Sequence, residues 1–450
     1  MMKPIILLTT FCLVIKISGY GQGIFESEQQ SKTDSIQKGI VFNGYVRASV
    51  FGASKLFDYS SLFTEFSLQS KFSHEDVYLY SDIRFRNGLN FGEKYTVFQI
   101  KETYAGYQSN KFDVFLGNQI VKWGRTDGFN PTNNFSPKDY FFLSADPDDR
   151  DLSTFMLRMK YRISPAIDLD FITIPVYRAS NYRYDLFDIG KNVNYKPIVL
   201  PEKIFKNASF AARLNFEYPQ IGFSVSYFRG YDPFFGFKID TIIFSTGTPV
   251  ITDVSIPYFK NTIGTDFALP VSSWIFRAEA AYNITTDYES NMYIPNPDIT
   301  YVTALEHKFW GITTILQYIG KYTFDFTDLQ KPVLFDPTNP SAQMQYADKI
   351  INYESALFNR KMFYQQEKNN HAVMLVVNKN FAYDTWKAEL AGYYNITSED
   401  LLIRPQITWE ISDMLSTTIG GTYMQGTNKS VFEYSAPVLS GVFVQIKASF

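Results

Sequence analysis

The chain closes with the stretch VFVQIKASF, residues 442–450, and this stretch decides the fold. Counted back from Phe450, every second residue is apolar, and the residues between them are polar except Phe443. Successive side chains of a β-strand point to opposite faces, so a period of two predicts a strand with one apolar and one polar face. An amphipathic helix would instead repeat its apolar positions every three or four residues.

The same alternation recurs along most of the chain. Segments of about ten residues with a period of two follow one another, which is the signature of strands rather than helices. Laid end to end, they predict about eighteen strands, with sixteen as the alternative. The clearest examples, besides the closing stretch, are residues 77–86, 155–162, 274–283, 386–394 and 404–411.

The connections between these segments separate a soluble β-protein from a membrane barrel. Short turns are predicted near 73–76, 108–110, 164–165, 218–220, 270–273, 308–311, 382–385 and 412–414. Longer polar connections fall between them, the largest at Val121–Leu152, Pro175–Lys206, Gly230–Val254 and Asp325–Asn369. This regular alternation of short and long connections is typical of outer-membrane barrels, which have tight periplasmic turns and long external loops. A propeller would show a blade-length repeat, and none is found.

Composition agrees with an all-β, transmembrane, antiparallel up-and-down β-barrel. The 450 residues include 42 Phe and 32 Tyr, yet the mean hydropathy is only -0.15. A strand with one lipid face and one wet face averages to such a value, and Tyr and Trp gather at membrane interfaces. One Cys excludes a disulfide framework, and a net charge of -3 without a basic cluster argues against a nucleic-acid partner.

The N-terminal residues predict export. Residues 1–21 combine Lys3, an apolar stretch and a small-x-small site near Gly21, which is typical of a secretory signal peptide. Residues 22–38 are polar without periodicity and are interpreted as a periplasmic lead-in. The barrel is expected over 39–450, in the outer membrane of a bacterium. No later stretch reaches the roughly 18 to 20 apolar residues of a membrane-spanning helix.

Partners follow from this location. A terminal Phe450 on an alternating strand resembles the C-terminal signature of bacterial outer-membrane proteins, which implies contact with the barrel assembly machinery. Outer-membrane lipid and lipopolysaccharide would cover the apolar faces, because a closed barrel satisfies its backbone internally while its exterior stays apolar. The oligomeric state and the identity of any small solute are left open by the sequence.

The polar faces carry charges of both signs. One interpretation is that these charges pair across strands and stiffen the wall. The other is a constriction with cationic and anionic sides that orients a polar solute, in which Arg158, Lys160 and Arg162 form the densest ladder of one sign. The candidates for lining the pore are Arg84, Arg86, Arg158, Lys160, Arg162, Arg277, Glu279 and Arg404.

One segment, GNQIVKWGRTDGFNPTNNFSPKDY at residues 117–140, has the look of a motif. Its Trp123-Gly124-Arg125 and Asn130-Pro131 resemble a motif in a family of porin-like outer-membrane barrel proteins of unknown function, akin to porins and exopolysaccharide-export barrels. The resemblance implies a loop in the lumen or at the rim, and transport of small or amphipathic molecules. Two prolines stiffen this loop, which either folds inward to narrow the pore or holds the external rim together.

No catalytic or metal motif is found. The nucleophile-elbow, HExxH and P-loop patterns do not occur, so neither an enzyme nor a cofactor is expected. The acidic run Asp146–Asp151 lacks the Gly and distal Glu of a Ca²⁺ loop and is interpreted as a solvated turn. Helical spacing within 342–366 predicts a helical cap in the longest loop. The sequence favours a channel for small polar or amphipathic molecules by passive diffusion. The alternative is a non-conducting structural or assembly component of a surface complex.

Overall fold

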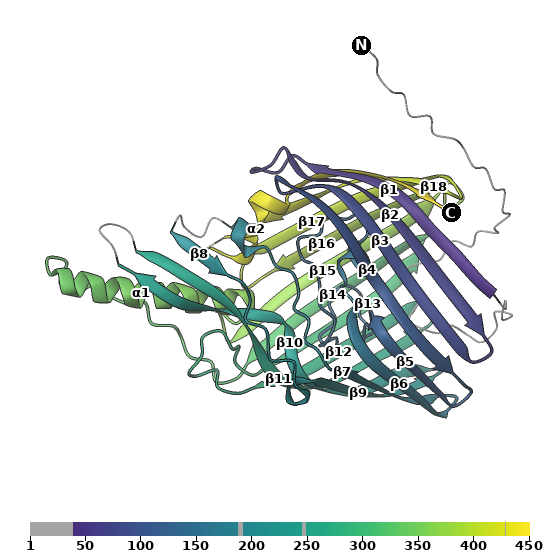
Figure 1. Cartoon of the computed structure of the whole chain (residues 1–450), viewed down its shortest axis with the longest axis horizontal. Coiled ribbons are helices and arrows are strands. Elements are labelled where there is room, and N and C mark those ends of the chain that lie inside the picture. The colour runs from purple at the N-terminus through teal and green to yellow at the C-terminus, as the bar shows by residue number, and fades with distance from the viewer. Residues whose placement is uncertain (1–38, 188–191, 245–248, 428) are drawn as a thin grey trace, which may run out of the picture. The chain divides into compact units, whose positions relative to one another are not determined.

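The computed structural model describes residues 39–187, 192–244, 249–427 and 429–450, and these form a closed β-barrel (Figure 1). Eighteen of the nineteen strands pair antiparallel in chain order, and the first pairs with the last to close the barrel. The extra strand, β8 (Val193–Lys196), pairs in parallel with the outer part of β11. The predicted count of eighteen is therefore confirmed.

The barrel strands have the following bounds: β1 Gly39–Gly52, β2 Tyr59–His74, β3 Val77–Asn90, β4 Glu93–Gln108, β5 Phe112–Gln119, β6 Thr154–Ser164, β7 Ile167–Ile174, β9 Ser209–Tyr218, β10 Ile221–Ile243, β11 Val250–Val271, β12 Trp274–Thr285, β13 Asp298–Phe309, β14 Ile312–Thr323, β15 Asn369–Phe381, β16 Trp386–Asn395, β17 Asp400–Ser412, β18 Leu415–Gln425 and β19 Gly441–Ser449. The first described strand begins at Gly39, and the predicted domain bounds stay a prediction. The expected signal peptide and lead-in, 1–21 and 22–38, lie outside the described residues.

The two faces of each strand are inverted relative to a soluble protein. In β19, Val442, Val444 and Ile446 are 62%, 44% and 49% exposed, whereas Gln445 is buried at 6%. The apolar face thus points outward and the polar face into the lumen. So large an apolar exterior is stable only in lipid, and closure leaves no strand edge unpaired there. Over the described residues, no helix has both the length and the apolar character to cross a membrane.

All eight predicted short turns occur at one end of the barrel. At the other end, where long connections are predicted, two connections are short. Phe91-Gly92 alone joins β3 to β4, and residues 396–399 join β16 to β17, so the predicted alternation of short and long connections is wrong at these two places. The long loop predicted at Gly230–Val254 is also wrong. Its alternating Phe, Ile and Val residues instead extend β10 to Ile243 and begin β11 at Val250, so this hairpin projects beyond its neighbours (Figure 1).

The loop end also carries the helices. α1 (Pro340–Met362) confirms the helix predicted in the longest loop, and Asn339 caps its first turn. Asn359 fixes α1 to the projecting hairpin, because its side chain both accepts from the N–H and donates to the carbonyl of Phe237. α2 (Val431–Leu439), capped by Ser430, was not predicted. Three 3₁₀ turns complete the described elements: η1 Pro147–Arg150, η2 Tyr184–Leu186 and η3 Phe205–Asn207.

The core lies inside the barrel. The connection between β5 and β6, residues 120–153, turns into the lumen and is called the inward loop below. Its Phe141 and Phe142 join Phe51, Phe63 and Phe443 of the wall in one buried cluster. Phe443, the one apolar residue on the polar face of the closing strand, stacks on Phe51 with ring centroids 5.0 Å apart. The apparent break in alternation therefore marks where the inward loop meets the wall.

Candidate functional site: a constriction in the lumen

The predicted cationic ladder on β6 is paired. Arg158, buried at 7% exposure, lies 2.7 Å from Asp170 on β7, and Lys160 lies 3.7 Å from Asp168 on the same strand. Arg162 bonds to a carboxylate of β5, that of Asp113. Cross-strand pairing, the first interpretation of these charges, is thus confirmed for the ladder. A role for the ladder in ion selectivity stays a prediction.

Arg84 and Arg86, the pore-lining candidates on β3, also lie against carboxylates, and one of these carboxylates belongs to the inward loop. Arg84 lies 3.0 Å from Asp82 of its own strand and 2.8 Å from Asp149 of the loop. Arg86 donates from Nε to Glu65 at 2.6 Å, and its guanidinium lies 3.9 Å from the ring centroid of Phe142. The wall therefore supplies both charged and cation–π contacts to the loop.

The first attachment of the inward loop is centred on Asp149. Its carboxylate lies 2.5 Å from Arg47 and 2.8 Å from Arg84, and Lys101 donates to its carbonyl at 2.9 Å. Burial opposes ionisation, but the two arginines outweigh it and hold the pKa of Asp149 below its usual range. The interpretation of the acidic run as a solvated turn is confirmed for the exposed Asp146 and Asp148 and is wrong for Asp149, because a buried arginine pair binds this carboxylate in the lumen.

The second attachment is centred on Glu279 of β12. This buried carboxylate, 2% exposed, accepts from the backbone N–H groups of Arg125 and Thr126. It also accepts from the hydroxyls of Thr126 and Thr132, at 2.8 and 3.0 Å. The neighbouring candidate Arg277 lies 2.5 Å from Glu306 and 3.5 Å from Asp127 of the loop. Burial raises the pKa of Asp127, and Arg277 opposes this shift.

The motif residues form the base of the inward loop. Trp123 is 2% exposed and packs edge-on against Phe135, with ring centroids 4.9 Å apart. Gly124 has a φ of +118°, and a Cβ there would lie 2.7 Å from a Glu279 carboxylate oxygen, so the turn admits only glycine. Arg125 lies 2.6 Å from both Asp266 and Glu217 on the facing wall. The segment therefore lies in the lumen, the first of its two predicted positions.

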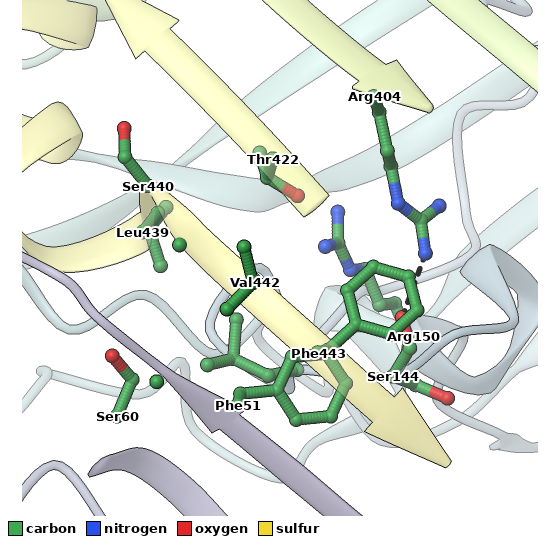
Figure 2. A pocket seen from close by; sticks show the side chains of 13 residues that line it. Phe51, Ser60, Ser144, Arg150, Arg404, Thr422, Leu439, Ser440, Val442 and Phe443 are labelled. Carbon is green, nitrogen blue, oxygen red and sulfur yellow. Dashed lines mark hydrogen bonds between the residues drawn. The ribbon is translucent and has the colours of Figure 1, made fainter. Parts of the chain in front are cut away.

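Two neighbouring arginines in the lumen form no ion pair within the described residues. Arg404 of β17 donates to the carbonyls of Ser144 and Ala145 at 2.8 and 2.7 Å, and Arg150 donates from Nε to that of Phe142 at 3.2 Å. Among the described residues, neither forms an ion pair. Figure 2 shows both side chains beside a small pocket that Ser144 and Phe443 also line.

Arg150 was not predicted, because it lies in a loop without periodicity. Burial and the neighbouring Arg404 lower the pKa of Arg150 to about 10, so it still carries its charge at neutral pH. Two positive charges therefore lie side by side at this point of the lumen. Asp139 and Asp151 near Arg150, and Glu389 and Asp146 near Arg404, offset them only at longer range than an ion pair. The cations of the ladder on β6, in contrast, each lie against a carboxylate. The candidate site consists of the inward loop, its two attachments and this arginine pair.

An apolar exterior, a polar lumen and eighteen closed strands define the class of this protein, an outer-membrane β-barrel with a porin-like fold. No known family profile and no curated protein sequence matches the chain. The resemblance carried by the Trp123–Pro131 motif therefore stays a prediction.

Solved structures of outer-membrane proteins share the fold. OccK3 (OpdO) of Pseudomonas aeruginosa is 10% identical with a TM-score of 0.52, and the match covers 91% of this chain and 95% of that chain. The outer-membrane protein OpdK of the same organism is 8% identical, with a TM-score of 0.53 over 92% and 98%. OccAB3 of Acinetobacter baumannii is also 8% identical, with a TM-score of 0.53 over 91% and 99%. Another OpdK structure was determined with vanillate.

Proposed function

We propose that this protein is an outer-membrane channel through which small polar molecules diffuse passively, and that the inward loop forms its constriction. The observation that carries the proposal is the loop itself, which is attached to opposite parts of the wall by Asp149 and by Glu279. A barrel of eighteen strands has room for an aqueous channel. A loop fixed across it sets the size and the charge of what passes.

The attachments support diffusion rather than driven transport. Buried carboxylates that each receive several charged or polar donors are costly to separate, so the loop is expected to keep its position as solutes pass. A static constriction selects by fit and potential, as in known channels. The unpaired charges of Arg150 and Arg404 favour solutes with an anionic or electron-rich group at this point. Vanillate, the molecule present in one OpdK structure, carries such a group.

Planar-bilayer recording of the refolded protein tests the proposal. We expect discrete channel openings, and liposomes containing the protein should swell in iso-osmotic solutions of small solutes but not of large ones. The absence of both conductance and swelling would instead support a non-conducting structural component.

A further inference from the structure

A second cavity lies between the inward loop and the wall formed by β10 to β14. It offers about 200 Å³ to water-sized molecules and shares no lining residue with the pocket beside Arg404. Its walls include Asn130 and Asn133 of the loop, Asp232 and Lys260 of the hairpin, and Asp298 and Lys321 of β13 and β14. The Asn130-Pro131 end of the motif therefore faces a space of its own.

The charges that line this cavity cancel. Lys260 lies 2.7 Å from Asp232, and Lys321 lies 3.4 Å from Asp298. Each ammonium has a further acceptor, because Lys260 donates to the side chain of Asn134 at 2.7 Å and Lys321 to the carbonyl of Phe363 at 2.9 Å. A singly charged ligand would displace one partner and leave a buried charge uncompensated, which is expensive, and a zwitterion would have to break an existing pair and replace both of its contacts.

Neutral hydrogen-bonding groups remain available in the cavity. Over the described residues, the amide oxygen of Asn130 and the amide nitrogen of Asn133 have no hydrogen-bond partner, although the other amide atom of each is engaged. One free acceptor and one free donor suit hydroxyl groups, which both donate and accept. The rings of Phe129, Tyr258 and Phe363 also line the cavity and offer apolar faces to the C–H groups of a ligand.

We propose that this cavity is a recognition site for a small uncharged polyhydroxylated molecule of the monosaccharide class. The proposal rests on the proposed channel function, in which the site lies on the path beside the constriction, and it names a class of solute. The arginine pair and this cavity then act on different properties of a solute, the first on charge and the second on hydroxyl pattern.

Saturation-transfer NMR on the full-length protein in nanodiscs tests the site without requiring conduction. The probes are D-glucose, its anionic analogue gluconate, its cationic analogue glucosamine, and the zwitterion L-serine. We expect saturable binding of D-glucose that is tighter than that of the other three. Tighter binding of any charged or zwitterionic probe, or no saturable binding of D-glucose, would overturn the proposal.

Two substitutions of one ion pair sharpen the test. Lys260→Gln leaves the site with a net negative charge and should shift preference toward glucosamine, whereas Asp232→Asn leaves it positive and should shift preference toward gluconate. Each shift should be at least about tenfold, because the remaining charge of the pair then faces the ligand without its partner. The control is Lys387→Gln, which removes an exposed cation of β16 paired 3.0 Å from Glu410. Unchanged preferences in both variants would refute the assignment.

Bilayer recording separates the two proposals. D-Glucose that binds by NMR to a protein without conductance would refute the channel and leave the site standing. Conductance that D-glucose neither blocks nor modulates, together with no binding by NMR, would refute the site and leave the channel.

Discussion

Replacement of Glu279 by alanine should release one end of the inward loop and widen the channel. The carboxylate accepts from two backbone N–H groups and two hydroxyls of the loop, and it is nearly inaccessible to solvent. Alanine removes every one of these acceptors. The backbone of β12 is unaffected, because its ladder bonds to β11 and β13 do not involve the side chain.

The size of the effect follows from the donors that lose their partner. A buried donor without an acceptor costs about 1 to 3 kcal/mol. Water can reach some of the four donors, so we count two, which weakens docking of the loop by roughly 2 to 6 kcal/mol. At 1.4 kcal/mol per factor of ten, the lower value reduces the docked-to-undocked ratio roughly 30-fold. Glu279→Gln keeps one acceptor oxygen and should have a smaller effect.

Single-channel recording and limited proteolysis measure the outcome. Glu279→Ala should give a larger and noisier conductance than the native protein, and a protease should cleave within 120–153. Glu410→Ala is the matched control, because Glu410 lies on the same kind of wall strand but pairs with Lys387 and not with the loop. Native conductance and native protease resistance in Glu279→Ala would show that this carboxylate does not hold the loop.

Four further predictions address the same site. Arg404→Gln should shift the reversal potential toward cation selectivity, because it removes a positive charge that forms no ion pair at the constriction. Lys387→Gln should not shift it, because Lys387 is exposed to solvent ions and paired with Glu410. Asp149→Asn should destabilise the docked loop by about 3 to 5 kcal/mol, because it breaks two buried ion pairs. The Asp149 attachment should persist at about pH 4, near the pKa of an unperturbed carboxyl, and be lost only at lower pH, since the pKa of Asp149 is lowered; proteolysis at bonds near residue 149 measures this. Gly124→Ala should loosen the loop by about 1 to 3 kcal/mol through backbone strain and contact with Glu279, measured by proteolysis.

The barrel could be predicted from the sequence because each strand and each short turn is recognisable from a few consecutive residues. Each strand repeats its pattern every two residues, and each turn at the tight end has little freedom in length. The projecting β10–β11 hairpin shows where this reasoning fails. Segments of about ten residues are expected from the sequence, which predicts a connection over Gly230–Val254, whereas β10 and β11 extend through it and contact α1 through Asn359.

The site could be predicted only in part, because it depends on contacts between residues distant in sequence. Wall residues such as Arg84 and Glu279 were found, since alternation places them in the lumen. Their partners were not, because nothing local links Asp149 to Arg84, which lies 65 residues earlier in the chain. Phe443 carried a usable signal, since an apolar residue on a polar face marks a contact inside the barrel.

The distribution of charge explains how a lumen with many charges can remain selective. Along the wall, each cation of the ladder on β6 faces a carboxylate, so its field cancels over a short distance. The inward loop changes this balance locally, because it places Arg150 next to Arg404, and neither arginine forms an ion pair within the described residues. Beside it, the loop contributes neutral amides to a cavity whose own charges cancel. Selectivity should therefore depend on the position of the loop more than on any single wall residue, and variants that release the loop should lose charge preference and solute preference together.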